Sequence, residues 1–172
     1  MALPTTATAL ALEPLGLDLL VDLLAGRLRR PARWHPEYPT GDTLDAASML
    51  LAGYQALGFS VPARPVWWLY GIVVDGVVVG DAGFHGPPPP GRPVEVAIGY
   101  QVVPGRRRHG LATTACGRLL ELAWAHGADL VRADAEPENF ASRAVLRANG
   151  FRLAPDGDFV VAAPGREVPW RD

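Results

Sequence analysis

The sequence predicts an α/β protein in which one mixed β-sheet carries helices on both of its faces. The first observation is the order of the expected elements: two helices, three strands, then helix, strand, helix and two strands. The second is a strand, a basic turn and a helix that follow one another between Val94 and Leu122. The third is a length of 172 residues with 49% apolar residues, which fits one globular domain, residues 1–172, with about six to seven strands.

The overall composition excludes several classes of function. A net charge of −2 argues against general binding to nucleic acid or to an anionic membrane. The single cysteine, Cys116, excludes an intrachain disulfide and a cysteine cluster for zinc, and we expect no bound metal. No window reaches the ~18 apolar residues of a membrane helix, and residues 1–20 lack the Lys or Arg of a signal peptide. We therefore expect a cytoplasmic protein.

The first 40 residues predict an edge segment, a helix and a loop. Residues 1–12 are typical of a loose or edge segment, and leucines at helical spacing predict a helix over residues 15–28. The loop over residues 30–41 is rich in proline and contains two large aromatic residues, Trp34 and Tyr38. We expect this loop either to cover the core or to line a site.

A second helix is predicted to begin at Asp42 and to end near Gly58. Asp42 is a plausible N-cap, with Asp45 three residues further on. The face that this helix would bury comprises Leu44, Ala47, Leu51 and Tyr54.

The middle of the chain predicts a β-hairpin. Residues 66–74 and 77–84 are rich in β-branched and aromatic residues, and Asp75-Gly76 between them indicates a type I′ turn. The four consecutive prolines at 87–90 then predict an extended connector to the next strand.

The segment that follows predicts a strand, an anion-binding turn and a helix. Apolar and polar residues alternate over residues 94–103, and Pro104 ends the strand. Helical spacing begins at Leu111, so the basic turn at residues 106–109 lies at a helix N-terminus. The free amides and positive dipole of such an end bind phosphates, and Gly110 permits a close approach or a positive φ.

The C-terminal part predicts a strand, a helix and a hairpin. The strand covers residues 129–135, and the helix begins at Asn139 as N-cap and ends at Gly150. Residues 151–154 and 158–163 form the expected hairpin around an Asp-Gly turn.

Two motifs within these elements resemble one known family. The first is Arg107-x-x-Gly110-x-Ala112, which follows an I-G-Y strand. The second is Asn139-x-x-Ser142-x-x-x-Leu146-x-x-x-Gly150-Phe151. Together they resemble the acyl-CoA-binding segments of the GNAT superfamily of N-acyltransferases, and most closely its branch of ribosomal-protein N-terminal acetyltransferases. The resemblance covers about residues 66–153.

The resemblance implies where acetyl-CoA, the acyl donor, would bind. The strands near 94–103 and 129–135 would splay apart, and the pantetheine arm would pair with one of them. The implied cofactor-binding residues are Val102, Val103, Arg107, Arg108, His109, Gly110, Leu111, Ala112, Thr113, Asn139 and Ser142.

It also implies N-acetyl transfer to a primary amine of a small molecule or a protein N-terminus, by direct attack through a tetrahedral intermediate. The amine must lose a proton first, and Glu95 is the candidate general base, with Asp81, His85 and Glu136 in reserve. The amide of Val102 is the implied oxyanion donor.

Two positions depart from the family pattern. Many relatives have an acid immediately before I-G-Y, where this chain has Ala97, and a tyrosine that protonates the leaving thiolate where it has Leu146. A non-catalytic acyl-CoA-binding regulatory module is therefore the alternative function. Nucleic-acid binding is a third hypothesis, but the chain lacks the overall positive charge of such proteins. The identity of the amine stays open, and we expect a monomer or homodimer.

Overall fold

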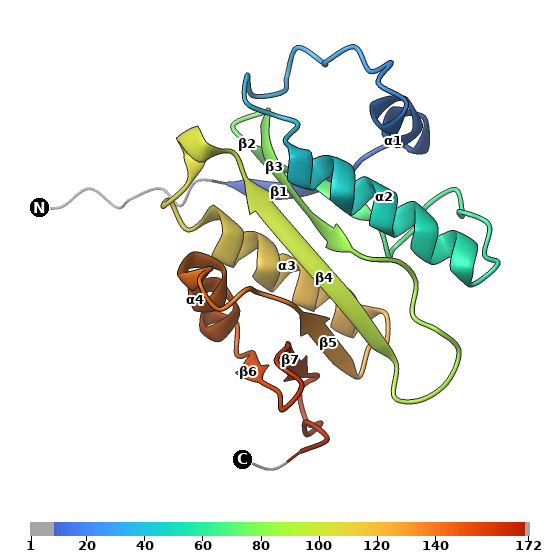
Figure 1. Cartoon of the computed structure of the whole chain (residues 1–172), viewed down its shortest axis with the longest axis vertical. Helices are drawn as coiled ribbons and strands as arrows, with labels where there is room; N and C mark the ends of the chain where they lie inside the picture. Colours follow the sequence, from blue (N-terminus) through green and yellow to red (C-terminus); the bar gives the residue numbers. More distant parts are fainter. Residues whose placement is uncertain (1–8, 171–172) are drawn as a thin grey trace, which may run out of the picture.

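The computed structural model describes residues 9–170 and contains one mixed, seven-stranded sheet with helices on both faces, as predicted (Figure 1). The strand order is β1-β2-β3-β4-β5-β7-β6. The strands are β1 (Leu10–Pro14), β2 (Leu69–Val74), β3 (Val77–Phe84), β4 (Glu95–Val102), β5 (Leu130–Ala133), β6 (Arg152–Leu153) and β7 (Phe159–Ala162). The α-helices are α1 (Leu17–Leu24), α2 (Gly41–Ala56), α3 (Leu111–Ala125) and α4 (Phe140–Ala148).

The N-terminal segment adds a strand that was expected only as a loose or edge segment. β1 pairs antiparallel with β2, with Leu10 opposite Val74, and forms one edge of the sheet. Residues 1–8 of the expected segment lie outside the described residues. The helix expected over residues 15–28 is shorter, because α1 begins after Gly16 and ends at Leu24.

The start and the buried face of α2 differ from the prediction. Thr40, and not Asp42, is the N-cap, and its amide donates a hydrogen bond to Thr43 Oγ1 at 3.2 Å. The helix buries Thr43, Ala47, Leu50 and Tyr54, whereas Leu44 is exposed. The predicted face was therefore wrong at Leu44, whereas Leu51 is partly buried against the core. Burial of the Thr43 hydroxyl, which also binds Asp81, rotates the helix away from the purely apolar choice.

The loop over residues 30–41 covers the core. Trp34 and Tyr38 are buried, and their rings meet edge to face with centroids 4.7 Å apart. Glu37 in the same loop accepts a hydrogen bond from the amide of Gly105 at 2.8 Å. The loop is thereby attached to the turn that precedes α3.

The hairpin of β2 and β3 is confirmed, including its turn. Asp75 and Gly76 have φ of +51° and +77°, the positive values that a type I′ turn requires.

The sheet then separates between β4 and β5. β5 pairs with β4 in parallel only over Glu95–Ala97, whereas β3 pairs with β4 from Ile98 to Val102. The C-terminal half of β4 therefore has no strand on its β5 side, and the predicted splay is confirmed.

Among residues 9–170, no helix combines the length and the apolar character that crossing a membrane would need.

Candidate active site

A pocket of about 470 Å³ lies at the splay, between the C-terminal end of β4 and the N-terminal ends of α3 and α4. Its wall combines a strand edge, a basic turn and the first turns of two helices. The residues that line it are Asp42, Tyr100, Gln101, Val102, Arg106, Arg107, Arg108, Gly110, Leu111, Ala112, Thr113, Asn139, Ala141, Ser142 and Val145.

The turn before α3 presents backbone amides to this pocket. Gly110 is the N-cap of α3 and has φ of +73°, and Arg108 also has a positive φ of +65°. The amide of Thr114 donates to the carbonyl of Gly110 at 3.0 Å, which is the first hydrogen bond of the helix. The amides of residues 111–113 precede that bond, so the helix leaves them without intrahelical acceptors. This positive end of the helix suits an anion.

The arginines of the turn add positive charge to the same end of the pocket. Arg107 Nε donates to the carbonyl of Val102 at 2.9 Å, which fixes its side chain against the end of β4. The amide of Val103 donates to the carbonyl of Val79 on β3. By alternation along the strand, the N–H and C=O of Val102 therefore point to the other side, toward the splay. Arg106 and Arg108 also line the pocket. The unpaired edge of β4 and the basic turn thus lie side by side.

The opposite wall is the first turn of α4. Asn139 Oδ1 accepts from the amide of Ser142 at 3.1 Å, which confirms Asn139 as the helix cap. Tyr100 on β4 reaches across to α4, with its hydroxyl 3.1 Å from Ser142 Oγ. Burial raises the pKa of Tyr100 to about 12, so the phenol stays protonated at neutral pH. Tyr100 therefore links the two walls of the splay with a neutral side chain.

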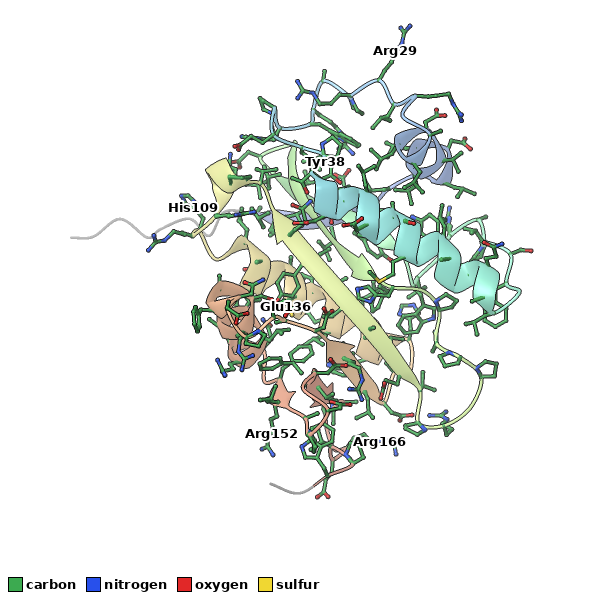
Figure 2. All side chains as sticks on the ribbon, viewed as in Figure 1. Arg29, Tyr38, His109, Glu136, Arg152 and Arg166 are labelled. Atoms are coloured by element: carbon green, nitrogen blue, oxygen red, sulfur yellow. The ribbon has the colours of Figure 1, made fainter. Side chains whose placement is uncertain are left out.

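Most of the expected cofactor-binding residues meet at this pocket. Those that line it are Val102, Arg107, Arg108, Gly110, Leu111, Ala112, Thr113, Asn139 and Ser142. Val103 is fully buried beneath β4, and His109 is exposed, with Nδ1 2.7 Å from the carbonyl of Arg107. Figure 2 shows His109 pointing away from the body of the protein. These two residues do not line the pocket.

Glu95 lies at the other end of β4, where this strand still pairs with β5. Its Oε1 accepts from Arg132 Nε at 3.0 Å, and Arg132 also binds Asp156 and Asp158 through Nη1. Glu95 is thus part of a charged network between β4, β5 and the terminal hairpin. The structure does not bring it to the pocket.

The reserve candidates occupy three different environments. Asp81 is buried and accepts from Thr43 Oγ1 and Gln101 Nε2, each at 2.7 Å, and burial raises its pKa to about 6. Glu136 is exposed on the loop between β5 and α4 (Figure 2). His85 is partly buried directly after β3, and its amide donates to the carbonyl of Ala97 at 2.9 Å.

Tyr100 and Gln101 are pocket residues that the motifs did not indicate. Alternation along the strand could have placed Gln101 on the face of Gly99, but only the observed pairing shows that this end of β4 is open. Cys116 is fully buried in α3, and burial raises its pKa to about 12, so it stays a neutral thiol. In the described part of the chain, no group of three His, Cys, Asp or Glu side chains is arranged to hold a metal ion.

Comparison with known proteins agrees with this geometry. The sequence matches the family model of the acetyltransferase (GNAT) domain over residues 10–152. No curated protein matches the sequence.

Several solved structures share the fold. One is yncA, a putative acetyltransferase from Salmonella typhimurium with acetyl-CoA, at 20% identity and TM-score 0.59, covering 94% of this chain and 98% of that one. RimJ from Mycobacterium smegmatis, in complex with CoA-disulfide, has 24% identity and TM-score 0.60, covering 92% and 84%. RimL, a ribosomal alpha-N-protein acetyltransferase in complex with coenzyme A, has 17% identity and TM-score 0.55, covering 92% and 96%.

The family model spans most of the chain, including the strand edge, the basic turn and both helix N-termini that form the pocket. The protein therefore belongs to the GNAT family and is an acetyl-CoA-dependent acetyltransferase.

Proposed function

We propose that the protein transfers the acetyl group of acetyl-CoA to a primary amine, with both substrates meeting at the splay between β4 and β5. The observation that carries this proposal is the pocket in which an anion-binding helix N-terminus adjoins an unpaired strand edge. Phosphates suit the first feature, and the amides of a pantetheine arm suit the second.

The donor would be held mainly by backbone groups. The amides of residues 111–113 and the side chains of Arg106 and Arg108 would contact the phosphates, because they share one end of the pocket. The edge of β4 at Val102 would pair with the pantetheine arm, and Asn139 and Ser142 would face it from α4. The solved structures of yncA and RimL, which contain acetyl-CoA and CoA, support acetyl-CoA as the donor.

Acidic residues around the opening favour a cationic acceptor. Asp42 lines the pocket, and Asp134, Glu136 and Glu138 are exposed on the segment that leads from β5 to α4. A protonated amine would be attracted to these carboxylates, whereas the phosphates would be drawn to the arginines of the turn. RimL, an alpha-N-protein acetyltransferase, is a structural neighbour that acts on an amine, which agrees with an amine acceptor.

The reaction needs the amine in its neutral form. Its nitrogen attacks the thioester carbonyl, and the Val102 amide is the candidate donor to the oxyanion. Leu146 is buried and carries no proton, so the thiolate leaves without help from this position. A thiol pKa near ~8.5 makes such a departure feasible.

A turnover screen tests the proposal. The protein is incubated with acetyl-CoA and a peptide with a free N-terminus, a polyamine, an amino acid or an aminoglycoside, and free CoA thiol is measured. We expect amine-dependent release of CoA with at least one of these acceptors. CoA binding by calorimetry without turnover of any amine would instead indicate a non-catalytic acyl-CoA-binding module. Absence of CoA binding would reject the assignment of the pocket.

A further inference from the structure

One face of β4 next to the pocket is partly open. Side chains alternate along this strand, so Ala97, Gly99 and Gln101 lie on the face covered by α2, where Gln101 binds Thr43. These three residues are partly exposed, whereas Ile98 and Val102 on the other face are buried. Gln101, at the end of this face, also lines the pocket, whereas Ala97, Gly99 and His85 lie beyond its lining.

His85 lies on this open face. It follows the last residue of β3, and its amide donates to the carbonyl of Ala97, so the two residues are neighbours across the strands. A β-carbon added to Gly99 would lie 3.1 Å from His85 Nε2, which means that the glycine makes room for the imidazole. Gln101 is two residues further along the same face, about 7 Å away along the strand.

The imidazole is also at the place where the sheet opens. The last residue of β4 that pairs with β5 is Ala97, and Gly99 already belongs to the unpaired half. His85 therefore stands beside the splay, on the α2 side, whereas Arg106 and Arg108 mark its phosphate-binding end.

The other titratable groups near this face are less suited to accept a proton from an amine. The side chain of Ala97 carries no proton acceptor. Glu95, two residues before Ala97, accepts a hydrogen bond from Arg132. Asp81 is 1% exposed and already accepts two hydrogen bonds on one oxygen. His85 combines partial exposure with a ring directed at the open half of β4.

We propose that His85 Nε2 is the general base that deprotonates the acceptor amine, in place of a carboxylate at position 97. This inference rests on the proposed function. His85 takes one proton from the acceptor ammonium and releases it to solvent. The neutral nitrogen then forms a bond to the thioester carbonyl carbon, and the carbon–sulfur bond breaks as the oxyanion collapses. The second proton lost by nitrogen neutralises the CoA thiolate, so one proton is released per acetyl group transferred.

The charge state of the imidazole agrees with this role. Burial lowers the pKa of His85 below its ordinary value of 6.5, and the nearby carboxylate of Asp134 opposes that shift in part. The ring is therefore mainly neutral at pH 7 and able to accept a proton. Protonation of His85 removes the base, so the contribution of His85 to the rate should be lost as the pH drops through this lowered pKa.

Kinetics of His85→Gln test the proposal with the best amine from the turnover screen. We expect kcat/KM to fall about 10²–10⁴-fold at neutral pH, as for the loss of a general base, while CoA affinity changes less than about twofold. The loss should be largest at acidic and neutral pH and should shrink as the pH approaches the pKa of the acceptor amine, about 10.4 for a lysine-like amine, because the amine then becomes neutral without help. His85→Ala should regain part of its activity when imidazole is added, which a merely structural role would not allow.

Two further variants sharpen the outcome. His126→Gln makes the same change at the exposed C-cap of α3 and should retain wild-type kinetics. Glu95→Gln tests the competing base: a large loss there together with near-normal His85→Gln would overturn the proposal, as would parallel pH profiles of wild type and His85→Gln. Wild-type protein that turns over no amine would instead reject the proposed function, and this inference with it.

Discussion

Gly110 shows how one residue can serve the fold and the ligand at once. Its φ of +73° is a conformation that L side chains rarely adopt, and it places Gly110 as the N-cap of α3. Apart from the two chain neighbours of Gly110, no atom of residues 9–170 lies within 4 Å of a β-carbon added there, so packing within this part of the chain does not demand glycine. A side chain would cost backbone strain and would occupy the pocket that Gly110 lines.

We therefore expect Gly110→Val to weaken CoA binding by more than about tenfold while the protein remains folded. Gly127→Val is the matched control, because Gly127 follows the other end of α3, has φ of +82° and also has open space around it. Both variants should lose stability through strain, by about 1–2 kcal/mol. Only Gly110→Val should weaken CoA binding in calorimetry, and equal affinity in the two variants would show that the turn does not hold the phosphates.

At the scale of single residues, the sequence predicted which motif residues meet at the pocket, but it could not show the surroundings of the candidate bases. Gly110, Asn139 and Ser142 lie within one turn-and-helix unit each, so spacing along the chain was enough to place them at the pocket. The neighbour relation of His85 and Ala97 depends on the pairing of two strands, which spacing cannot show. Glu95 was the candidate because its strand borders the predicted splay, and the structure pairs it with Arg132, on the half of β4 that pairs with β5.

Among the elements, helices and turns with strong local signals were predicted well. The Asp75-Gly76 turn and the Asn139 cap are confirmed, because each is decided by a few neighbouring residues. The buried face of α2 was not predicted correctly, because the burial of Thr43 follows from its hydrogen bond to Asp81 on β3. β1 was not predicted as a strand, because its pairing with β2 joins segments about 60 residues apart.

The N-terminus of α4 offers a test of two compatible roles for Asn139, as a helix cap and as a pocket residue. Asn139→Ala removes the acceptor of the Ser142 amide and should lower the free energy of unfolding by about 1 kcal/mol. It should also weaken CoA binding, because Asn139 lines the pocket.

Asn139→Asp separates the two roles. Aspartate caps a helix as well as asparagine does, so stability should be retained, whereas a new negative charge beside the donor site should still weaken CoA binding. Denaturant unfolding and calorimetry of both variants decide the matter. If Asn139→Asp binds CoA like the wild type, Asn139 is a helix cap only.

For the molecule as a whole, the buried polar cluster around Asp81 joins helix α2 to the strands β3 and β4 of the sheet. Asp81 on β3 accepts from Thr43 on α2 and from Gln101 on β4, so one carboxylate connects a helix and two strands. The Tyr38 hydroxyl is buried beside it without a hydrogen-bond partner of good geometry. This cluster borders the pocket through Gln101. Because it connects three elements of the core, its effect is measured as the free energy of unfolding of the whole domain.

The raised pKa of Asp81 predicts an unusual dependence of stability on pH. Burial raises this pKa from 3.8 to about 6, so between these values the folded state holds a proton that the unfolded state has lost. The folded state is thus favoured at low pH, and stability contributed by Asp81 is lost as the pH rises from about 4 to about 6. A shift of about two pKa units corresponds to roughly 3 kcal/mol.

Asp81→Asn should remove this dependence, because an amide cannot ionise and keeps an oxygen that can accept a hydrogen bond from Thr43. The measurement is the free energy of unfolding by urea for wild type and variant at pH values below about 4 and above about 6. Other carboxylates titrate in both proteins, so only the difference between the two curves reports on Asp81. We expect the variant to gain about 3 kcal/mol relative to the wild type on going from the acidic to the neutral condition. A difference that stays constant across this range would mean that Asp81 ionises as readily in the folded protein as in the unfolded chain, and that the cluster holds its charge without penalty.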